Sequence, residues 1–214
     1  MRKTILCSTI TIIGIILIIL IATISVTKFK PIYNFSVNIF DIDSNANLPK
    51  EKILDNYSYI VDYILNDEAM FELPSLPFSE DGAIHFQEVK ELFNLCKKVI
   101  LILISTLIIL LIVYINKYRD FMCLKYTGLG LIMTPLVGGI MVSLNFNYFF
   151  TVFHKIFFNN NKWIFDPQTD PIINILPEEF FALCGGVILF FCILTGLFMY
   201  IAHNKYIKYQ LKTT

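Results

Sequence analysis

Two histidines lie where apolar stretches of this chain meet polar ones. His85 stands in residues 84–90, before a long apolar run, and His154 opens a polar segment that ends at Asp170. That segment also holds the only tryptophan, three adjacent asparagines and two aspartates. Histidine titrates near neutral pH, so two histidines at one membrane surface favour general acid–base catalysis. This pair is the leading candidate for a catalytic site.

Acidic and polar side chains near the histidines have chemistry that would support them. Glu88 follows His85 by one helical turn, where its carboxylate would orient the ring or raise its basicity. Asp166 or Asp170 would do the same for His154. Asparagine, tyrosine and lysine side chains are the candidate donors to a developing oxyanion: Asn159, Asn160, Asn161, Tyr148 and Lys155. Trp163 lies in the same polar segment. The alternative is a pair of histidines that merely end helices, beside asparagines that only form a turn.

No metal site or covalent nucleophile is recognisable. Two histidines with carboxylates can bind zinc, but the chain has no H-E-x-x-H motif and no histidines four residues apart. The third histidine, His203, is expected at the opposite membrane surface. A G-x-S-x-G elbow and a glycine-rich phosphate loop are also missing from the sequence. We expect neither a metal nor a cofactor.

Membrane helices must position these residues. The chain has 214 residues, is 56% hydrophobic and has only 16% charged residues. A spanning helix needs about 20 mostly apolar residues, and four stretches qualify: 5–26, 99–115, 124–144 and 181–201. Their interiors carry no charged side chain, which argues against a transporter or pump. The sequence therefore predicts a single α-helical integral membrane domain with four transmembrane helices.

The third span should be the most deeply packed, because glycines and a proline interrupt it. Small residues let helices approach closely, and neighbouring helices can satisfy the backbone groups that proline frees.

Charge distribution predicts the orientation in the membrane. The short segments predicted to lie inside hold one acid, Asp120, and a dense set of basic residues: Arg2, Lys3, Lys117, Arg119, Lys125, Lys205, Lys208 and Lys212. This bias follows the positive-inside rule. The first apolar run is longer than that of a typical signal peptide and no A-x-A-like site follows it, so we expect a retained anchor. Both termini are then cytoplasmic.

Two extracytoplasmic loops, residues 28–98 and 145–180, should form a cap on the outer face of the cell membrane. Partial alternation predicts a strand over residues 31–43, and a hairpin or paired extended segment is expected over residues 71–86. Helices are predicted from Pro49 to about Leu65, from near His85 into the second span, over residues 150–158, and from Pro177 into the fourth span. The first loop is acidic and lacks basic–aromatic alternation, which argues against nucleic-acid binding.

At these segments the chain resembles the lipoprotein intramolecular transacylase family, Lit, of bacterial four-span membrane proteins. The matching stretches are residues 85–90 before the second span and a longer set before the fourth: Phe153, His154, Asn159, Trp163, Asp166, Asp170 and residues 176–178. Length and topology agree over essentially the whole chain. Glu88 stands where an aspartate is common in that family.

The resemblance implies an acyltransferase that acts on lipoproteins whose N-terminal cysteine carries a diacylglyceryl thioether. The sn-2 acyl chain would move to the α-amine of that cysteine, giving the lyso form with one N-linked and one O-linked chain. We expect His85 by preference to take the proton of the amine, and His154 to protonate the departing oxygen or steady the oxyanion. The partners would be the lipoprotein substrate and membrane lipids.

The sequence is also compatible with two other classes of function. A non-catalytic membrane scaffold that docks another protein would not depend on either histidine. An interfacial lipid hydrolase would release free fatty acid, whereas a transfer reaction keeps the number of acyl groups constant.

Overall fold

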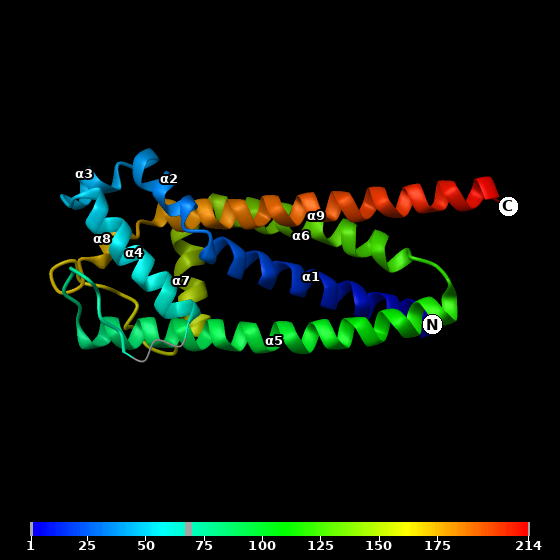
Figure 1. Ribbon diagram of the computed structural model, residues 1–214, viewed down its shortest axis with the longest axis horizontal. Coiled ribbons are helices and arrows are strands. Elements are labelled where there is room, and N and C mark those ends of the chain that lie inside the picture. Colours follow the sequence, from blue (N-terminus) through cyan, green and yellow to red (C-terminus); the bar gives the residue numbers. More distant parts are fainter. Residues whose placement is uncertain (1, 67–69, 214) are drawn as a thin grey trace. The chain divides into compact units, whose positions relative to one another are not determined.

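The computed structural model describes residues 2–66 and 70–213, with side chains up to residue 210, and all regular elements in this part of the chain are helices. Four are long: α1 (Arg2–Lys28), α5 (Glu80–Tyr118), α6 (Met122–Leu144) and α9 (Glu178–Thr213), as labelled in Figure 1. Each is long and apolar enough to cross a membrane. The predicted four-helix membrane architecture is therefore confirmed.

Five short helices connect the long ones: α2 (Pro31–Ile39), α3 (Ile42–Ala46), α4 (Lys50–Leu65), α7 (Phe146–Phe157) and α8 (Ile172–Ile175). The chain divides into two compact units. Unit 1 holds the chain up to Thr23, Lys98–Ser143 and the chain from Val187, and unit 2 holds Ile24–Lys97 and Leu144–Gly186. The two loops predicted to form a cap therefore lie largely in unit 2.

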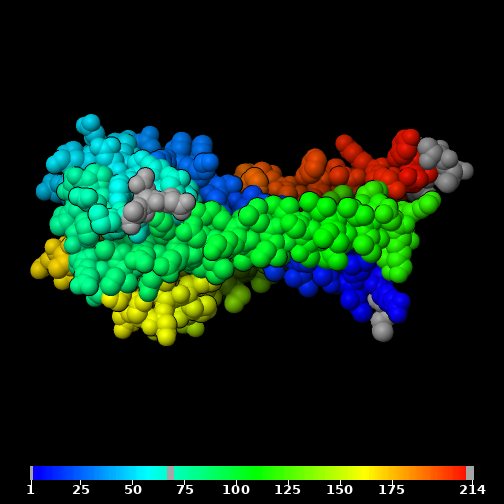
Figure 2. Space-filling view, turned by 60° about the horizontal axis from the view of Figure 1, so that its bottom comes forward, coloured from blue at the N-terminus to red at the C-terminus, as the bar shows by residue number. Residues whose placement is uncertain are grey.

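Unit 1 has the surface of a membrane protein. Its part of α5 exposes many large apolar side chains, and Figure 2 shows this helix surface in green, uncovered by other elements in that view. The exposed residues include Leu101, Ile102, Ile108, Ile109, Ile112 and Val113. Soluble monomers rarely expose so large an apolar patch, whereas lipid chains cover it at no cost.

Helices α6 and α9 meet through two glycines of unit 1. A Cβ atom on Gly196 would lie 2.6 Å from the carbonyl oxygen of Gly128, and one on Gly128 would lie 2.7 Å from the carbonyl oxygen of Gly196. No real Cβ comes that close to a backbone oxygen, so only glycine permits this approach. Gly128 thus serves close helix packing. A larger share of the first span than of the third is buried, so the expectation that the third span is the most deeply packed one is wrong.

Unit 2 has an aromatic and aliphatic core that both loops build. The ring of Tyr33 on α2 stacks on Tyr57 of α4 with 3.7 Å between centroids, and Phe180 of α9 meets both rings edge-on. The buried hydroxyl of Tyr33 donates to the carbonyl oxygen of Ile175 at 2.5 Å. This core fixes segments far apart in the sequence against one another.

The strand predicted over residues 31–43 is wrong, because this stretch forms α2 and the start of α3. Pro31 occupies the first turn of α2, where its missing N–H costs nothing. Tyr33 and Val37 are four residues apart and both fully buried, so the apolar pattern is that of a helix. The other apolar side chains, such as Phe35 and Ile39, face outward.

The extended hairpin predicted over residues 71–86 is also wrong: no strand occurs in the described part of this stretch, and α5 already begins at Glu80. Side chains of α4 hold the irregular part instead. The Tyr59 hydroxyl donates to the carbonyl oxygen of Met70 and accepts from the N–H of Glu72, and Asn56 bonds Ser75. The helices predicted from Pro49, over residues 150–158 and from Pro177 are confirmed as α4, α7 and α9.

Candidate functional site

His85 lies on the second turn of α5, and the start of this helix is held by two polar side chains. The hydroxyl of Ser79 accepts a hydrogen bond from the N–H of Gly82 at 2.9 Å, as a helix N-cap does. Asp170 Oδ1 accepts from the N–H of Ser79 at 2.8 Å. A Cβ atom on Gly82 would lie 2.3 Å from the same oxygen, so glycine makes room for the carboxylate. Asp170 therefore anchors the helix that carries His85.

His154 lies on the inward face of α7. The side chain of Asn145 caps this helix by accepting from the N–H of Tyr148 at 3.0 Å. The imidazole stacks on Trp163 with 4.7 Å between centroids and an interplanar angle of 28°. Phe150, one turn earlier, packs 4.2 Å from the same ring. Aromatic side chains thus pack closely on this histidine.

The two histidines meet. The centroids of their rings lie 5.9 Å apart, and the side chains are 6% (His85) and 9% (His154) exposed. Phe158 and Phe165 pack on His85 at 4.9 and 5.5 Å. Both rings are therefore enclosed by aromatic side chains rather than by solvent.

This enclosure opposes protonation. Burial, with a smaller contribution from the nearby His154, lowers the pKa of His85 to about 4. Burial also lowers the pKa of His154, although its hydrogen bond to the carbonyl oxygen of Phe150 acts in the opposite direction. His85 precedes the apolar run of α5 by almost four turns and lies outside the span. Both imidazoles are neutral at pH 7 and available to accept a proton.

The hydrogen bond of His154 also determines its tautomer. Its Nδ1 lies 2.7 Å from the carbonyl oxygen of Phe150. A carbonyl oxygen can only accept, so Nδ1 carries the hydrogen in the neutral ring and Nε2 carries the lone pair. His154 can therefore act as an acid from Nε2 only after it has taken up a proton there.

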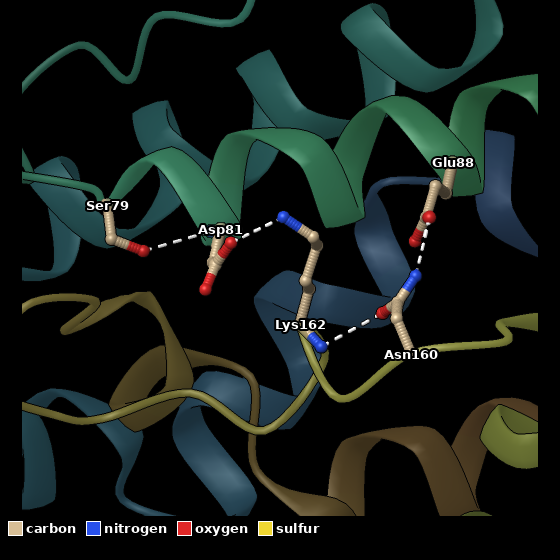
Figure 3. A network of polar contacts seen from close by, with 6 residues as sticks. Ser79, Asp81, Glu88, Asn160 and Lys162 are labelled. Atoms are coloured by element: carbon tan, nitrogen blue, oxygen red, sulfur yellow. Dashed lines mark hydrogen bonds and ion pairs between the residues drawn. The ribbon is translucent and has the colours of Figure 1, made fainter.

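Glu88 is tied to the loop after α7. Its Oε1 accepts a hydrogen bond from the side-chain amide of Asn160 at 2.7 Å (Figure 3). The carbonyl oxygen of Asn160 accepts from Nε1 of Trp163 at 3.0 Å. Asn160 therefore links the helix that bears His85 to the indole that stacks on His154.

Lys162 closes this network. Its N–H donates to Oδ1 of Asn160 at 2.9 Å, and its ammonium group pairs with Asp81 on the first turn of α5 at 2.5 Å (Figure 3). The ammonium group of this loop lysine is therefore already paired with a carboxylate.

Several side chains named from the sequence lie away from the histidine rings. Asp166 is exposed and its carboxylate accepts from the N–H of Gln168, which makes it a turn residue of its own loop. Asp170 is 3% exposed and serves the start of α5. Exposed side chains make up the rest of this group: Asn159, Tyr148 and Lys155. Of the proposed supporting residues, Trp163 stacks on His154, and Glu88 lies one turn after His85 on α5.

Sequence reasoning missed the contacts of Asn160 and the two phenylalanines that enclose His85. Three adjacent asparagines look alike in a sequence, and only their burial in the fold separates them. Asn160 is half-buried, whereas Asn159 and Asn161 are exposed. Within the described residues, no group of three or more histidine, cysteine or acidic side chains comes together as metal ligands would.

Comparison with known proteins now gives the family. The model of the family "lipoprotein intramolecular transacylase Lit" matches residues 8–181. A solved structure of the membrane-integral Lit from Bacillus cereus is 28% identical, covers 99% of this chain and 98% of its own, and has a TM-score of 0.91. Structures of that protein with H85R and H85A mutations, each 28% identical, have TM-scores of 0.88 and 0.87. Their matches cover 100% and 99% of this chain, and 95% and 96% of their own.

None of the curated proteins matches the chain. The family model nevertheless spans most of the sequence, and the likeness to the solved Bacillus cereus protein extends over both compact units. Four apolar helices and this membrane-integral relative make the chain a multi-pass membrane protein. It belongs to the family of lipoprotein intramolecular transacylases.

Proposed function

We propose that this protein moves an acyl chain within a lipoprotein. The substrate carries a diacylglyceryl thioether on its N-terminal cysteine, and the sn-2 acyl chain passes to the α-amine of the same residue. The product is the lyso form, with one N-linked and one O-linked chain. The observation that carries this proposal is the buried, neutral histidine pair, 5.9 Å between ring centroids, in a member of the transacylase family.

In the proposed reaction the amine nitrogen attacks the carbonyl carbon of the sn-2 ester. A C–N bond forms, and the carbonyl electron pair moves to oxygen. His85 removes the N–H proton, which becomes more acidic as the nitrogen donates its lone pair. The C–O bond then breaks, and the sn-2 oxygen leaves with the electron pair and receives that proton.

His154 acts in the second half of this reaction. Its neutral tautomer presents the lone pair of Nε2, so it first takes up the proton that His85 removed and then delivers it to the sn-2 oxygen. One proton moves through the pair, and both rings end neutral. This sequence agrees with the lowered pKa of each histidine, because neither needs to stay charged.

Positioning of the substrate's amine against its ester contributes much of the remaining catalysis. Nucleophile and ester belong to one molecule, so the protein has mainly to hold a near-attack geometry and exclude water. The aromatic enclosure of His85 by Phe158 and Phe165 supports that role, because a water molecule beside this base would compete with the amine for the ester carbon.

We infer that the site faces the outer side of the cytoplasmic membrane, with both termini inside. The basic residues of the short segments at the other ends of the spans support this orientation. A lipoprotein anchored in the outer leaflet would present its ester at that surface.

Mass spectrometry of a lipoprotein's N-terminal lipopeptide tests the proposal, in a host that lacks N-acylation. Expression of the protein should give an N-acyl peptide with one O-acyl chain and unchanged total mass. His85→Ala and His154→Ala should each lower conversion by at least about 100-fold, the effect of losing a general acid–base. Gln87→Ala is the matched control, since Gln87 is exposed on the same turn as His85.

Two outcomes would overturn the proposed reaction, and a third would overturn its mechanism. A diacylglyceryl peptide that keeps its free amine would point to a non-catalytic scaffold. Loss of one acyl chain without N-acylation would point to a hydrolase. Undiminished conversion by both alanine variants would remove the histidine pair from the mechanism.

A further inference from the structure

Two buried atoms on one face of α5 accept no hydrogen bond from the described part of the chain. They are Nδ1 of His85 and Oε2 of Glu88, each with almost no solvent-exposed surface. Residues three apart on a helix are neighbours on its surface. Neighbouring positions on this helix thus carry two side chains of the candidate site, and each has a buried polar atom without a partner.

Such atoms are costly in a folded protein. Buried polar groups almost always have a partner, and a buried carboxylate oxygen is more costly to leave without one than a neutral group. The two oxygens of Glu88 differ sharply in this respect. Oε1 is bonded to the Asn160 amide, which fixes the carboxylate, while Oε2 is held in place without a donor.

The lysine of the Asn160 network does not serve as that donor. The ammonium group of Lys162 is paired with Asp81 at 2.5 Å, and only the backbone N–H of Lys162 reaches the network, through Asn160. His154 donates its Nδ1 hydrogen to Phe150. The missing donor should therefore come with the substrate.

The substrate of the proposed reaction brings a group that fits. Model α-amines have a pKa of about 7.7–8.0, so most of the nucleophile is an ammonium ion at pH 7. An ammonium group offers a positive charge and three N–H donors, and it can bond an anionic oxygen and an imidazole nitrogen together. Neutral His85 has a lone pair for it in the tautomer that carries hydrogen on Nε2.

We propose that Oε2 of Glu88 and Nδ1 of His85 together bind the α-ammonium group of the substrate's N-terminal cysteine. This assignment rests on the proposed function and identifies the binding site of its nucleophile. His85 takes the ammonium proton, and the freed lone pair then attacks the ester carbon. His85 must pass that first proton on before it removes the second one from the attacking nitrogen. Over the whole reaction the ammonium loses two protons: one goes to the sn-2 oxygen and the other to solvent.

The same binding site for the α-amine explains release of the product. After transfer the nitrogen is an amide with one N–H and no charge, so its bond to the carboxylate is much weaker. Glu88 would distinguish the substrate from any lipoprotein whose cysteine is already N-acylated. The carboxylate acts here as a binding group for the reacting nitrogen.

The test uses two probes that cannot react, because alkyl ethers replace both esters of a diacylglyceryl-cysteine lipopeptide. One probe has the free α-amine and the other has hydrogen in its place. Binding to the detergent-solubilised protein is measured at pH 7 for the wild type, Glu88→Gln and Glu91→Gln. Glu91 is the matched control, because it lies one turn further along α5, is exposed and is bonded to Gln87.

The wild type and Glu91→Gln should bind the amine probe about tenfold or more tightly than the desamino probe, as a charge-assisted hydrogen bond implies. Glu88→Gln should lose most of this preference, with unchanged affinity for the desamino probe, because only the neutral His85 acceptor then remains. A preference in Glu88→Gln as large as that of the wild type would overturn the assignment. So would an equal loss of affinity for both probes, since that would show a purely structural role.

A measurement on the wild type covers the case in which Glu88→Gln does not fold. Preference for the amine probe should shrink as pH rises above 8, while affinity for the desamino probe stays constant. An unchanged preference at pH 10 would contradict the assignment. These binding results are independent of turnover. If the protein transfers acyl chains but does not prefer the amine probe, only the assignment of the ammonium site is refuted. If it prefers the amine probe but transfers no acyl chain, the proposed reaction is refuted.

Discussion

At the scale of single residues, burial keeps both histidines of the pair neutral. Surrounding aromatic rings remove the water that would stabilise an imidazolium, so both rings remain neutral over the physiological range. Neutral rings are weak bases, but they accept a proton once the attacking nitrogen has become acidic. The enclosure that weakens their basicity also protects the ester from hydrolysis.

The lowered pKa of His85 predicts that the fold loses stability in mild acid. The unfolded residue titrates near 6.5 and the folded one near 4, so the unfolded state binds more protons between these values. The contribution of His85 is complete above about pH 6.5 and decreases as the pH falls towards 4, by up to about 3 kcal/mol. Thermal unfolding in detergent at pH 7.5, 6 and 5 should show a falling midpoint.

His85→Phe is the matched variant for this prediction. Phenylalanine suits the aromatic surroundings and does not titrate, so the midpoint of this variant should fall less steeply with pH than that of the wild type. Parallel curves for the two proteins would contradict the prediction.

Sequence identified both histidines, but it did not rank their polar neighbours. Asp166 and Asp170 look equivalent in the chain, yet Asp166 is exposed and Asp170 is buried against Ser79. The difference arises from a contact between residues 91 positions apart, which no local pattern encodes. Asn159 and Asn160 differ for the same reason.

At the scale of elements, the start of α5 sets where His85 lies. Ser79 caps the helix and Asp170 holds Ser79. A loop residue that follows the third span in the sequence therefore fixes the first turn of α5. The acidic residues Glu80 and Asp81 in that turn also suit the helix dipole.

Gly82→Ala should therefore destabilise the protein, although alanine is the better helix former. Its Cβ would come within 2.3 Å of Asp170 Oδ1 and displace the carboxylate from the Ser79 N–H. We expect a loss of about 1–3 kcal/mol, the cost of a buried hydrogen bond left unmade. Thermal unfolding measures it, with Asp170→Ala and the double variant alongside.

The double variant should be no less stable than Asp170→Ala, because without the carboxylate there is nothing for the new methyl group to strike. Additive losses would show that Gly82 matters for another reason.

The sequence predicted α4, α7 and the starts of α5 and α9 in unit 2, but it did not predict α2, α3 or α8. The aromatic and β-branched residues of α2 suit strands as well as helices, and a partial alternation pointed to the wrong period. Burial of Tyr33 and Val37 against α4 and α9 decides in favour of the helix. Tertiary contacts therefore overrode local preference in this segment.

At the scale of the whole molecule, the four spans followed from hydropathy, since only a long apolar helix satisfies its backbone in lipid. The partner of each helix did not follow. Gly128 stands in a run with four glycines, and the sequence did not say that it would meet Gly196 of α9.

Gly196→Ala should weaken the packing of α6 against α9, because a methyl group there would strike the Gly128 carbonyl oxygen 2.6 Å away. Overpacking of this kind costs about 1–3 kcal/mol. The thermal unfolding midpoint should fall. Gly185→Ala on the same helix is the control, since a Cβ at Gly185 meets nothing within 4 Å and the midpoint should stay or rise. Equal midpoints for both variants would refute the role of this contact.

The hydroxyl bond from Tyr33 to Ile175 has a consequence for how the chain is made. The core of unit 2 needs Tyr33 and Tyr57 from the first loop and Ile175 and Phe180 from the second. Ribosomes add about 5–20 residues per second, and two membrane spans must be synthesised between these loops. The aromatic residues of the first loop therefore remain exposed for several seconds, until the last quarter of the chain has been synthesised and completes the core.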